Sequence, residues 1–120
     1  MSKKVLIIGA TGSIGSKVRK TLLQTTNYHL TLFSSSAGRI QVTPNREVGV
    51  SGNVMNKNDL MKVLPGQDAV FAALSGDLGG MAKSIVDSMK ACGVRRIIFI
   101  SSMGIYNEIP KFLVLSVEEI

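Results

Sequence analysis

Three glycines near the amino terminus, Gly9, Gly12 and Gly15, stand three residues apart at the end of a short apolar run. The run, Val5-Leu6-Ile7-Ile8, does not alternate with polar residues, as expected of a parallel strand covered on both faces. In a strand–turn–helix unit the first glycine permits a tight turn, the second lets the backbone approach a pyrophosphate, and the third lets the helix pack closely. Free N–H groups at the start of the following helix favour a phosphate anion. The spacing predicts a dinucleotide-binding turn, although a plain glycine-rich turn shares part of this pattern.

Few other side chains are spaced for chemistry. His29 is the only histidine and stands at the start of a predicted strand, so we prefer a structural role to that of a general base. Cys92 is the only cysteine, and we interpret it as a small buried residue in the last turn of a predicted helix. Histidine, cysteine and carboxylate residues show no ligand spacing, so no metal site is predicted.

Composition indicates one soluble domain. The chain has 120 residues, of which 45% are hydrophobic, so it is built to bury a core. No apolar run approaches the roughly 20 residues of a membrane span, and the first residues lead directly into a strand without a signal-type segment. We therefore expect a cytoplasmic protein without a membrane partner.

The formal net charge of +6 raises the question of nucleic-acid binding. The lysines and arginines are scattered along the chain, without interleaved aromatic residues or a recognition motif. A solvated surface that also attracts a polyanionic cofactor is the preferred interpretation, so no nucleic-acid partner is expected.

Helical periodicity marks two segments clearly. The first helix is predicted from about Ser13 to Thr25, because Ile14, Val18 and Leu22 recur on one face. The second segment follows position 80 and places three large apolar residues at helical spacing before the C-cap glycine, namely Met81, Ile85, Met89 and Gly93.

Turn signals separate these helices from further strands. The predicted strands after the first are Tyr28–Phe33, a short one near Glu47–Val50, Asp68–Leu74 and Ile97–Ile100. Residues 34–46 are predicted as a loop or weakly structured crossover, and Asn56 is predicted to cap a helix that ends before Pro65-Gly66. Strands alternating with helical crossovers predict an α/β fold, a Rossmann-like doubly wound parallel sheet of about five strands in the order 3-2-1-4-5. At this length we expect residues 1–120 to form one NAD(P)-binding Rossmann domain that is incomplete at its C-terminus.

Four segments in this order resemble one family. They are GATGSIG at 9–15, the Gly52-Asn53-Val54 turn, LPGQDAVFAALSG at 64–76 and GVRRIIFISSMGIY at 93–106. Together they are similar to the atypical short-chain dehydrogenase/reductases, and most similar to the NmrA-like NAD(P)-binding branch.

The resemblance implies a set of cofactor-binding residues. For the pyrophosphate they are Gly9, Thr11, Gly12, Ser13 and Ile14, and for the adenine Asn53 and Val54. Relatives usually have Asp where this chain has Asn53, and the Asn carbonyl can still accept a hydrogen bond from the adenine amine. Ala72, Ala73 and Leu74 would line the ribose and nicotinamide side, where open α/β sheets bind ligands, although packing against a helix would also select alanine.

The end of the second strand predicts which dinucleotide is preferred. An Asp or Glu there would bind the ribose hydroxyls and repel a 2′-phosphate, but this chain has Ser34, Ser35 and Ser36, with Arg39 nearby. NADP(H) is therefore favoured and NAD(H) stays possible. An incidental serine-rich surface loop is the alternative.

The sequence leaves catalysis open. In the enzymes of this family a Ser or Thr after the fifth strand polarises the substrate carbonyl, and Ser102 matches that role by position. A Tyr-x-x-x-Lys pair is absent, since Tyr106 and Lys111 are five residues apart. One hypothesis is an NAD(P)H-dependent oxidoreductase, or a fragment of one, acting on an unknown small-molecule substrate. The other is a non-catalytic NADP(H)-sensing or regulatory binding protein.

The C-terminal residues predict association. A sheet that stopped at its fifth strand would leave Ile97–Ile100 at an open, apolar edge. The apolar segment 112–117 could add to this edge, either its own or that of a second copy. We therefore expect a homodimer or a larger assembly.

Overall fold

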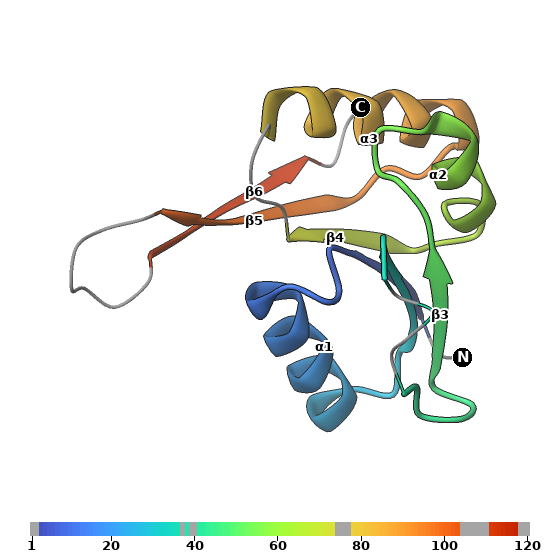
Figure 1. The fold of residues 1–120 in the computed structure, drawn as a ribbon, viewed down its shortest axis with the longest axis vertical. Coiled ribbons are helices and arrows are strands. Elements are labelled where there is room, and N and C mark those ends of the chain that lie inside the picture. The colour runs from blue at the N-terminus through green and yellow to red at the C-terminus, as the bar shows by residue number, and fades with distance from the viewer. Residues whose placement is uncertain (1–2, 37, 39–40, 74–77, 104–110, 118–120) are drawn as a thin grey trace.

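The computed structural model describes residues 3–36, 38, 41–73, 78–103 and 111–117, which form one sheet and three helices (Figure 1). In chain order the elements are β1 (Lys4–Ile8), α1 (Ser13–Thr25), β2 (His29–Ser34), β3 (Glu47–Ser51), α2 (Lys57–Val63), β4 (Ala69–Ala73), α3 (Leu78–Cys92), β5 (Ile97–Met103) and β6 (Lys111–Val117).

The sheet has the order β3-β2-β1-β4-β5-β6. The first five strands are parallel, with Ile8 opposite both Phe33 of β2 and Ala72 of β4. The predicted α/β fold with five parallel strands in the order 3-2-1-4-5 is thus confirmed. Because the strands run in one direction, their carboxyl ends meet at one edge of the sheet and their amino ends at the other.

Helices cover both faces of the sheet (Figure 1). Alternate residues of β1 point to opposite faces, since Val5 and Ile7 pack with the apolar side of α1 while Leu6 and Ile8 pack with α2 and α3. On the α3 side, the predicted stripe holds for Ile85 and Met89, which are fully buried. Unalternating apolar strands are what a sheet covered on both faces requires.

The helix termini follow the sequence signals. The bounds of α1 are those predicted. Asn56 caps α2, because its Oδ1 accepts hydrogen bonds from the backbone N–H groups of Asn58 and Asp59 at 2.9 and 3.3 Å. Gly93 follows α3 with φ of +78°, the left-handed conformation expected of a C-cap glycine.

The structure corrects two expectations. Ser34 is the last residue of β2 rather than the first of a loop, since β2 begins and ends one residue later than predicted. The prediction that Ile97–Ile100 form an open edge is wrong, because β6 pairs antiparallel with β5. This pairing places Val117 opposite Ile97 and Val114 opposite Ile100. The C-terminal segment therefore adds to the edge of its own sheet, and self-association stays a prediction without this ground.

In the part of the chain that the structure describes, no helix is both long and apolar enough to cross a membrane.

Candidate functional site

The glycine turn joins β1 to α1 at the carboxyl edge of the sheet. Gly9 has φ of +80°, and a Cβ there would lie 2.1 Å from the carbonyl oxygen of Ala73 in β4. A Cβ at Gly15 would lie 2.0 Å from the carbonyl oxygen of Gly9. Both positions exclude any side chain for packing reasons, so these two glycines bring the first turn of α1 against the loop and the loop against β4.

Gly12 differs from its two neighbours in the motif. It is the exposed N-cap of α1, and a Cβ there would meet nothing closer than the carbonyl oxygen of Gly9 at 3.4 Å. Packing alone does not require glycine at this position. The space that a side chain would fill lies in front of the first N–H groups of α1, where helix geometry leaves donors without intrahelical partners. Gly12 therefore leaves a cradle of the kind that a pyrophosphate needs.

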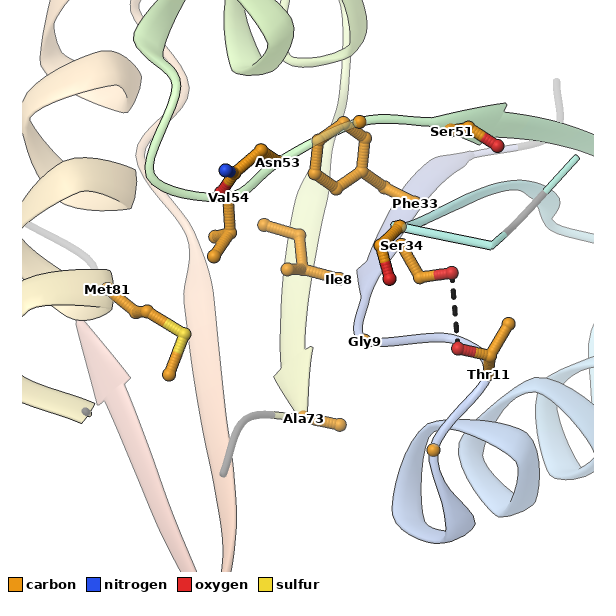
Figure 2. Close-up of a pocket in the computed structure, with 13 residues that line it drawn as sticks. Ile8, Gly9, Thr11, Phe33, Ser34, Ser51, Asn53, Val54, Ala73 and Met81 are labelled. Atoms are coloured by element: carbon orange, nitrogen blue, oxygen red, sulfur yellow. Dashed lines mark hydrogen bonds between the residues drawn. The ribbon is translucent and has the colours of Figure 1, made fainter. Parts of the chain in front are cut away.

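A groove of about 700 Å³ opens beside this turn (Figure 2). We call it the carboxyl-edge groove. Its wall is built from the ends of four neighbouring strands, the glycine turn, the 52–54 turn and the start of α3; its lining includes Ile8, Ser34, Ser51, Ala73 and Met81. Met81 faces the opening from the side opposite Thr11 and Ser34 (Figure 2). None of the described lining residues is acidic.

Hydroxyl groups gather where β2 ends. Thr11 Oγ1 of the glycine turn donates to Ser34 Oγ at 3.2 Å, a contact drawn in Figure 2. Ser36 donates to the same oxygen through its backbone N–H at 3.2 Å, and its hydroxyl lies 3.5 Å from Thr11 Oγ1. Ser35 is exposed and also lines the groove. These groups are neutral, so the end of β2 does not repel a phosphate. Ser34 Oγ accepts from Thr11 and from the N–H of Ser36, which leaves its own hydroxyl proton to donate to an anion.

The turn after β3 is held from three sides. A Cβ at Gly52 would lie 2.7 Å from the ring of Phe33, so glycine permits the close approach of this turn to β2. The backbone N–H of Asn53 donates to Asp59 at 2.9 Å, and the Val54 carbonyl accepts from Ser84 of α3 at 2.9 Å. Asn53 Oδ1 already accepts from the N–H of Met55 at 2.8 Å, so one of its two lone pairs is in use.

The remaining predicted site residues are placed differently. Ala73 lines the groove, whereas Ala72 is fully buried in the core beneath α2 and α3, so packing accounts for its small size. Ser13 and Ile14 form the start of α1. Ser102 lies within β5, opposite Phe112 of β6, rather than after the strand. Arg39 and Leu74 lie outside the described residues.

Sequence reasoning did not assign five of the lining residues to the site, namely Ile8, Phe33, Ser51, Gly52 and Met81. The first three are the last or next-to-last residues of parallel strands, and this position could have identified them. Ser51 Oγ accepts from the backbone N–H of Gly38 at 2.8 Å and so holds the crossover after β2 near the groove. Met81 was assigned only to the packed face of its helix.

A buried carboxylate, Glu47, holds the other end of that crossover. Its side chain is fully buried and forms a two-pronged ion pair with Arg19 of α1, and Glu47 Oε1 also accepts from the N–H of Thr43 at 2.8 Å. Burial would raise the pKa of Glu47, but the donors from Arg19 and Thr43 outweigh it, and the pKa is lowered. Arg19 also donates to the carbonyl of Gln41 at 2.9 Å.

Comparison with known proteins places this geometry among dinucleotide-binding domains. A family model described as NAD(P)H-binding matches residues 9–119. A Rossmann-fold NAD(P)-binding family protein from Shigella flexneri is 37% identical, with a TM-score of 0.70 over 81% of this chain and 50% of that one.

Two further proteins are similar to this chain. A short-chain dehydrogenase/reductase of the wide type from Veillonella parvula, solved in complex with NADP, is 28% identical with a TM-score of 0.75, over 87% of this chain and 49% of that one. A UDP-glucose 4-epimerase from Streptomyces lividans is 28% identical over 90% of this chain and 38% of its own length. The chain thus spans about half or less of the length of these relatives.

Proposed function

We propose, from the premise that the chain belongs to the NAD(P)H-binding family, that its carboxyl-edge groove binds NADP(H) in preference to NAD(H). The family match and the fold agree with the resemblance to the atypical short-chain dehydrogenase/reductases of the NmrA-like branch. Dinucleotide binding is thus the property that the family model and the two similar structures share, and the preference between the two dinucleotides is the part we infer.

One observation carries the preference. The end of β2 presents the hydroxyls of Thr11, Ser34 and Ser36 in contact with one another, and no acidic residue is among the described lining residues. A carboxylate at this position would bind the two ribose hydroxyls and repel a 2′-phosphate. Hydroxyls here, together with Arg39 five residues after Ser34 in the sequence, favour the phosphate instead, because hydrogen bonds to charged groups are the stronger ones.

Calorimetric titration with NADPH and NADH tests the preference. We expect tighter binding of NADPH, and a loss of about 1–3 kcal/mol for NADPH but little for NADH in Arg39→Ala. Lys90→Ala is the matched control, since it removes one positive charge from the exposed end of α3. Ser35→Asp should weaken NADPH binding more than tenfold, whereas the uncharged Ser35→Asn should not. Equal affinities for the two dinucleotides, unchanged by Ser35→Asp, would overturn the proposal.

We further propose that the chain is part of an oxidoreductase. A nicotinamide bound at the carboxyl edge would supply hydride chemistry there. Ser102 lies in the carboxyl-terminal part of β5, at the same edge of the sheet, where its hydroxyl would orient a substrate carbonyl. Action on a small-molecule substrate, a cytoplasmic location and self-association are likewise predictions.

The second candidate is a binding protein that responds to the NADP(H) state without turnover. It is favoured by the absence of a Tyr-x-x-x-Lys pair from the 120 residues. Oxidation of NADPH by carbonyl compounds, lost in Ser102→Ala, would support the enzyme. Tight NADPH binding with no oxidation across a broad carbonyl panel would support the binding protein.

A further inference from the structure

A second groove, of about 680 Å³, lies at the opposite end of the sheet, and we call it the amino-edge groove. It is lined by the first residues of β1 and β2, by β3 with the residues just before it, and by the end of α2 with the turn that leads to β4. Lys4 of β1 lies opposite His29 of β2 in the register. The N–H of Leu30 donates to the carbonyl of Arg46 at 2.8 Å, so Arg46 lies beside the start of β2. The polar residues Lys4, His29 and Arg46 therefore lie side by side where the strands begin. The groove shares no lining residue with the carboxyl-edge groove.

Positive charge dominates the lining. Lys4, Arg46 and Lys62 all line the groove, and Glu47 is the acidic residue among its described lining. Glu47 is already neutralised by Arg19, so its carboxylate does not offset the other cations. Arg46 donates to the backbone carbonyls of Tyr28 and Thr26 at 3.1 and 2.7 Å, which fixes its guanidinium without cancelling the charge.

Two further carboxylates in contact with these residues, Asp59 and Asp68, do little to compensate the positive charge. Asp59 lies 3.9 Å from Lys62, whose side chain is 72% exposed, so the pair is loose. Asp68 accepts from the backbone N–H of Lys4 at 2.8 Å rather than from its ammonium group. The groove thus keeps a net positive lining that would attract an anion.

The floor of the groove combines a hydroxyl donor with apolar surface. Gln67 Nε2 donates to Thr31 Oγ1 at 3.1 Å and to the carbonyl of Val63 at 2.9 Å, so the hydroxyl proton of Thr31 is left free to donate. Val48, opposite Thr31 in the register, is 59% exposed although it is large and apolar. Pro65 extends the apolar lining. A ligand that fits must therefore carry both negative charge and an apolar body.

We propose that the amino-edge groove binds a small organic anion with an apolar body, such as an aromatic carboxylate, independently of the dinucleotide groove. The carboxylate lies among Lys4, Arg46 and Lys62 and accepts from the Thr31 hydroxyl. The ring covers Val48 and Pro65. This site does not depend on the identity of the dinucleotide at the other edge.

Naphthoate is a suitable probe, with naphthalenemethanol as its neutral counterpart. Backbone amide shifts followed by NMR should move at Thr31, Val48 and Gln67 on addition of naphthoate, with and without saturating NADP⁺. Naphthalenemethanol should bind at least about fivefold more weakly, since it lacks the charge that the cations meet.

Variants separate the contributions of the Lys62 ammonium and the Thr31 hydroxyl to naphthoate binding. Lys62→Gln should weaken naphthoate binding about threefold, the range expected for a partly exposed charge contact. Lys83→Gln, which removes an exposed ammonium from α3 away from both grooves, should not. Thr31→Val should weaken binding and Thr31→Ser should retain it. Shifts confined to residues 9–15, displacement of naphthoate by NADP⁺, or equal binding of the neutral compound would overturn the proposal.

Discussion

The two grooves lie at opposite ends of the same parallel strands and have nearly the same volume, about 700 and 680 Å³, yet different chemical groups line them. The carboxyl-edge groove is lined by glycines, hydroxyls, an amide and apolar residues, with no charged side chain among its described lining. The amino-edge groove is lined by lysine, arginine and exposed valine. At the carboxyl edge the chain leaves β1, β3 and β4 toward the N-termini of α1, α2 and α3, so the backbone itself supplies donors. At the amino edge the chain arrives from loops, and side chains must supply the charge.

The comparison implies that the carboxyl edge tolerates added atoms least, and Gly9→Ala tests this most severely. The new Cβ would overlap the Ala73 carbonyl at 2.1 Å while the backbone stays at φ of +80°. We expect a loss of more than about 4 kcal/mol of unfolding free energy, measured by denaturant titration. Gly66→Ala is the matched control, because Gly66 has φ of +84° with nothing within 4 Å of its added Cβ. It should cost only about 1–2 kcal/mol. Equal losses in the two variants would mean that the close approach to β4 does not matter.

At the amino edge, the stability of the fold should instead depend on the ion pair between Arg19 and Glu47. Arg19→Met leaves the buried Glu47 carboxylate without its partner, and we expect a loss of about 3 kcal/mol at neutral pH. In the native protein the pKa of Glu47 is lowered from its ordinary value of 4.5. This shift stabilises the folded state at pH values above 4.5, and the stabilisation is lost as the pH falls below 4.5 toward the lowered pKa. In the variant, burial raises the pKa, so acid should stabilise the folded state relative to neutral pH.

Denaturant titration at a series of pH values measures how the unfolding free energy of the native protein and of Arg19→Met changes with pH. Lys83→Met breaks an exposed i,i+4 ion pair with Asp87 and serves as control, with an expected loss below about 0.5 kcal/mol. If Arg19→Met behaved like this control, the buried pair would not be what holds the crossover at the amino edge.

Among the three test variants, as opposed to the controls, the smallest effect on stability is expected for Gly12→Val, whose effect on binding should be large. Gly12→Val places a side chain in open space at the N-cap of α1, so we expect the folded state to lose only about 1 kcal/mol. The same side chain would occupy the cradle in front of the helix, so NADPH affinity should fall at least about a hundredfold. Circular dichroism and cofactor fluorescence measure the two effects. Normal NADPH binding by this variant would contradict the assignment of the cradle.

Much of the fold could be predicted because local signals agree with it. The apolar period of residues 13–25, the Asn56 cap and the glycine after Cys92 each act within a few residues, and each is present as predicted. The direction of β6 could not be predicted. An apolar segment such as 112–117 has the same pattern whether it joins a neighbour parallel or antiparallel, in its own chain or in another.

The glycine spacing singles out Gly12, and the structure leaves open space at that position, while its role in binding stays a prediction. The contact of Thr11 with Ser34 was not predictable, because it depends on the register of β1 against β2, which sequence spacing does not give. For the same reason Ala72 and Ala73, adjacent in sequence, are separated by the pleat, one into the core and one toward the groove.

The hydrogen bond between Thr11 and Ser34 also bears on the thermodynamics of association. It joins the glycine turn to the last residue of β2, far away in sequence. Ordering a turn residue only upon binding costs conformational entropy of about 1–2 kcal/mol at room temperature. Since this contact already forms on folding, the entropic cost of ordering the turn falls on folding, and less of it is subtracted from the free energy of binding. This corner of the protein is therefore preorganised, and its free and ligand-bound conformations are expected to be nearly the same.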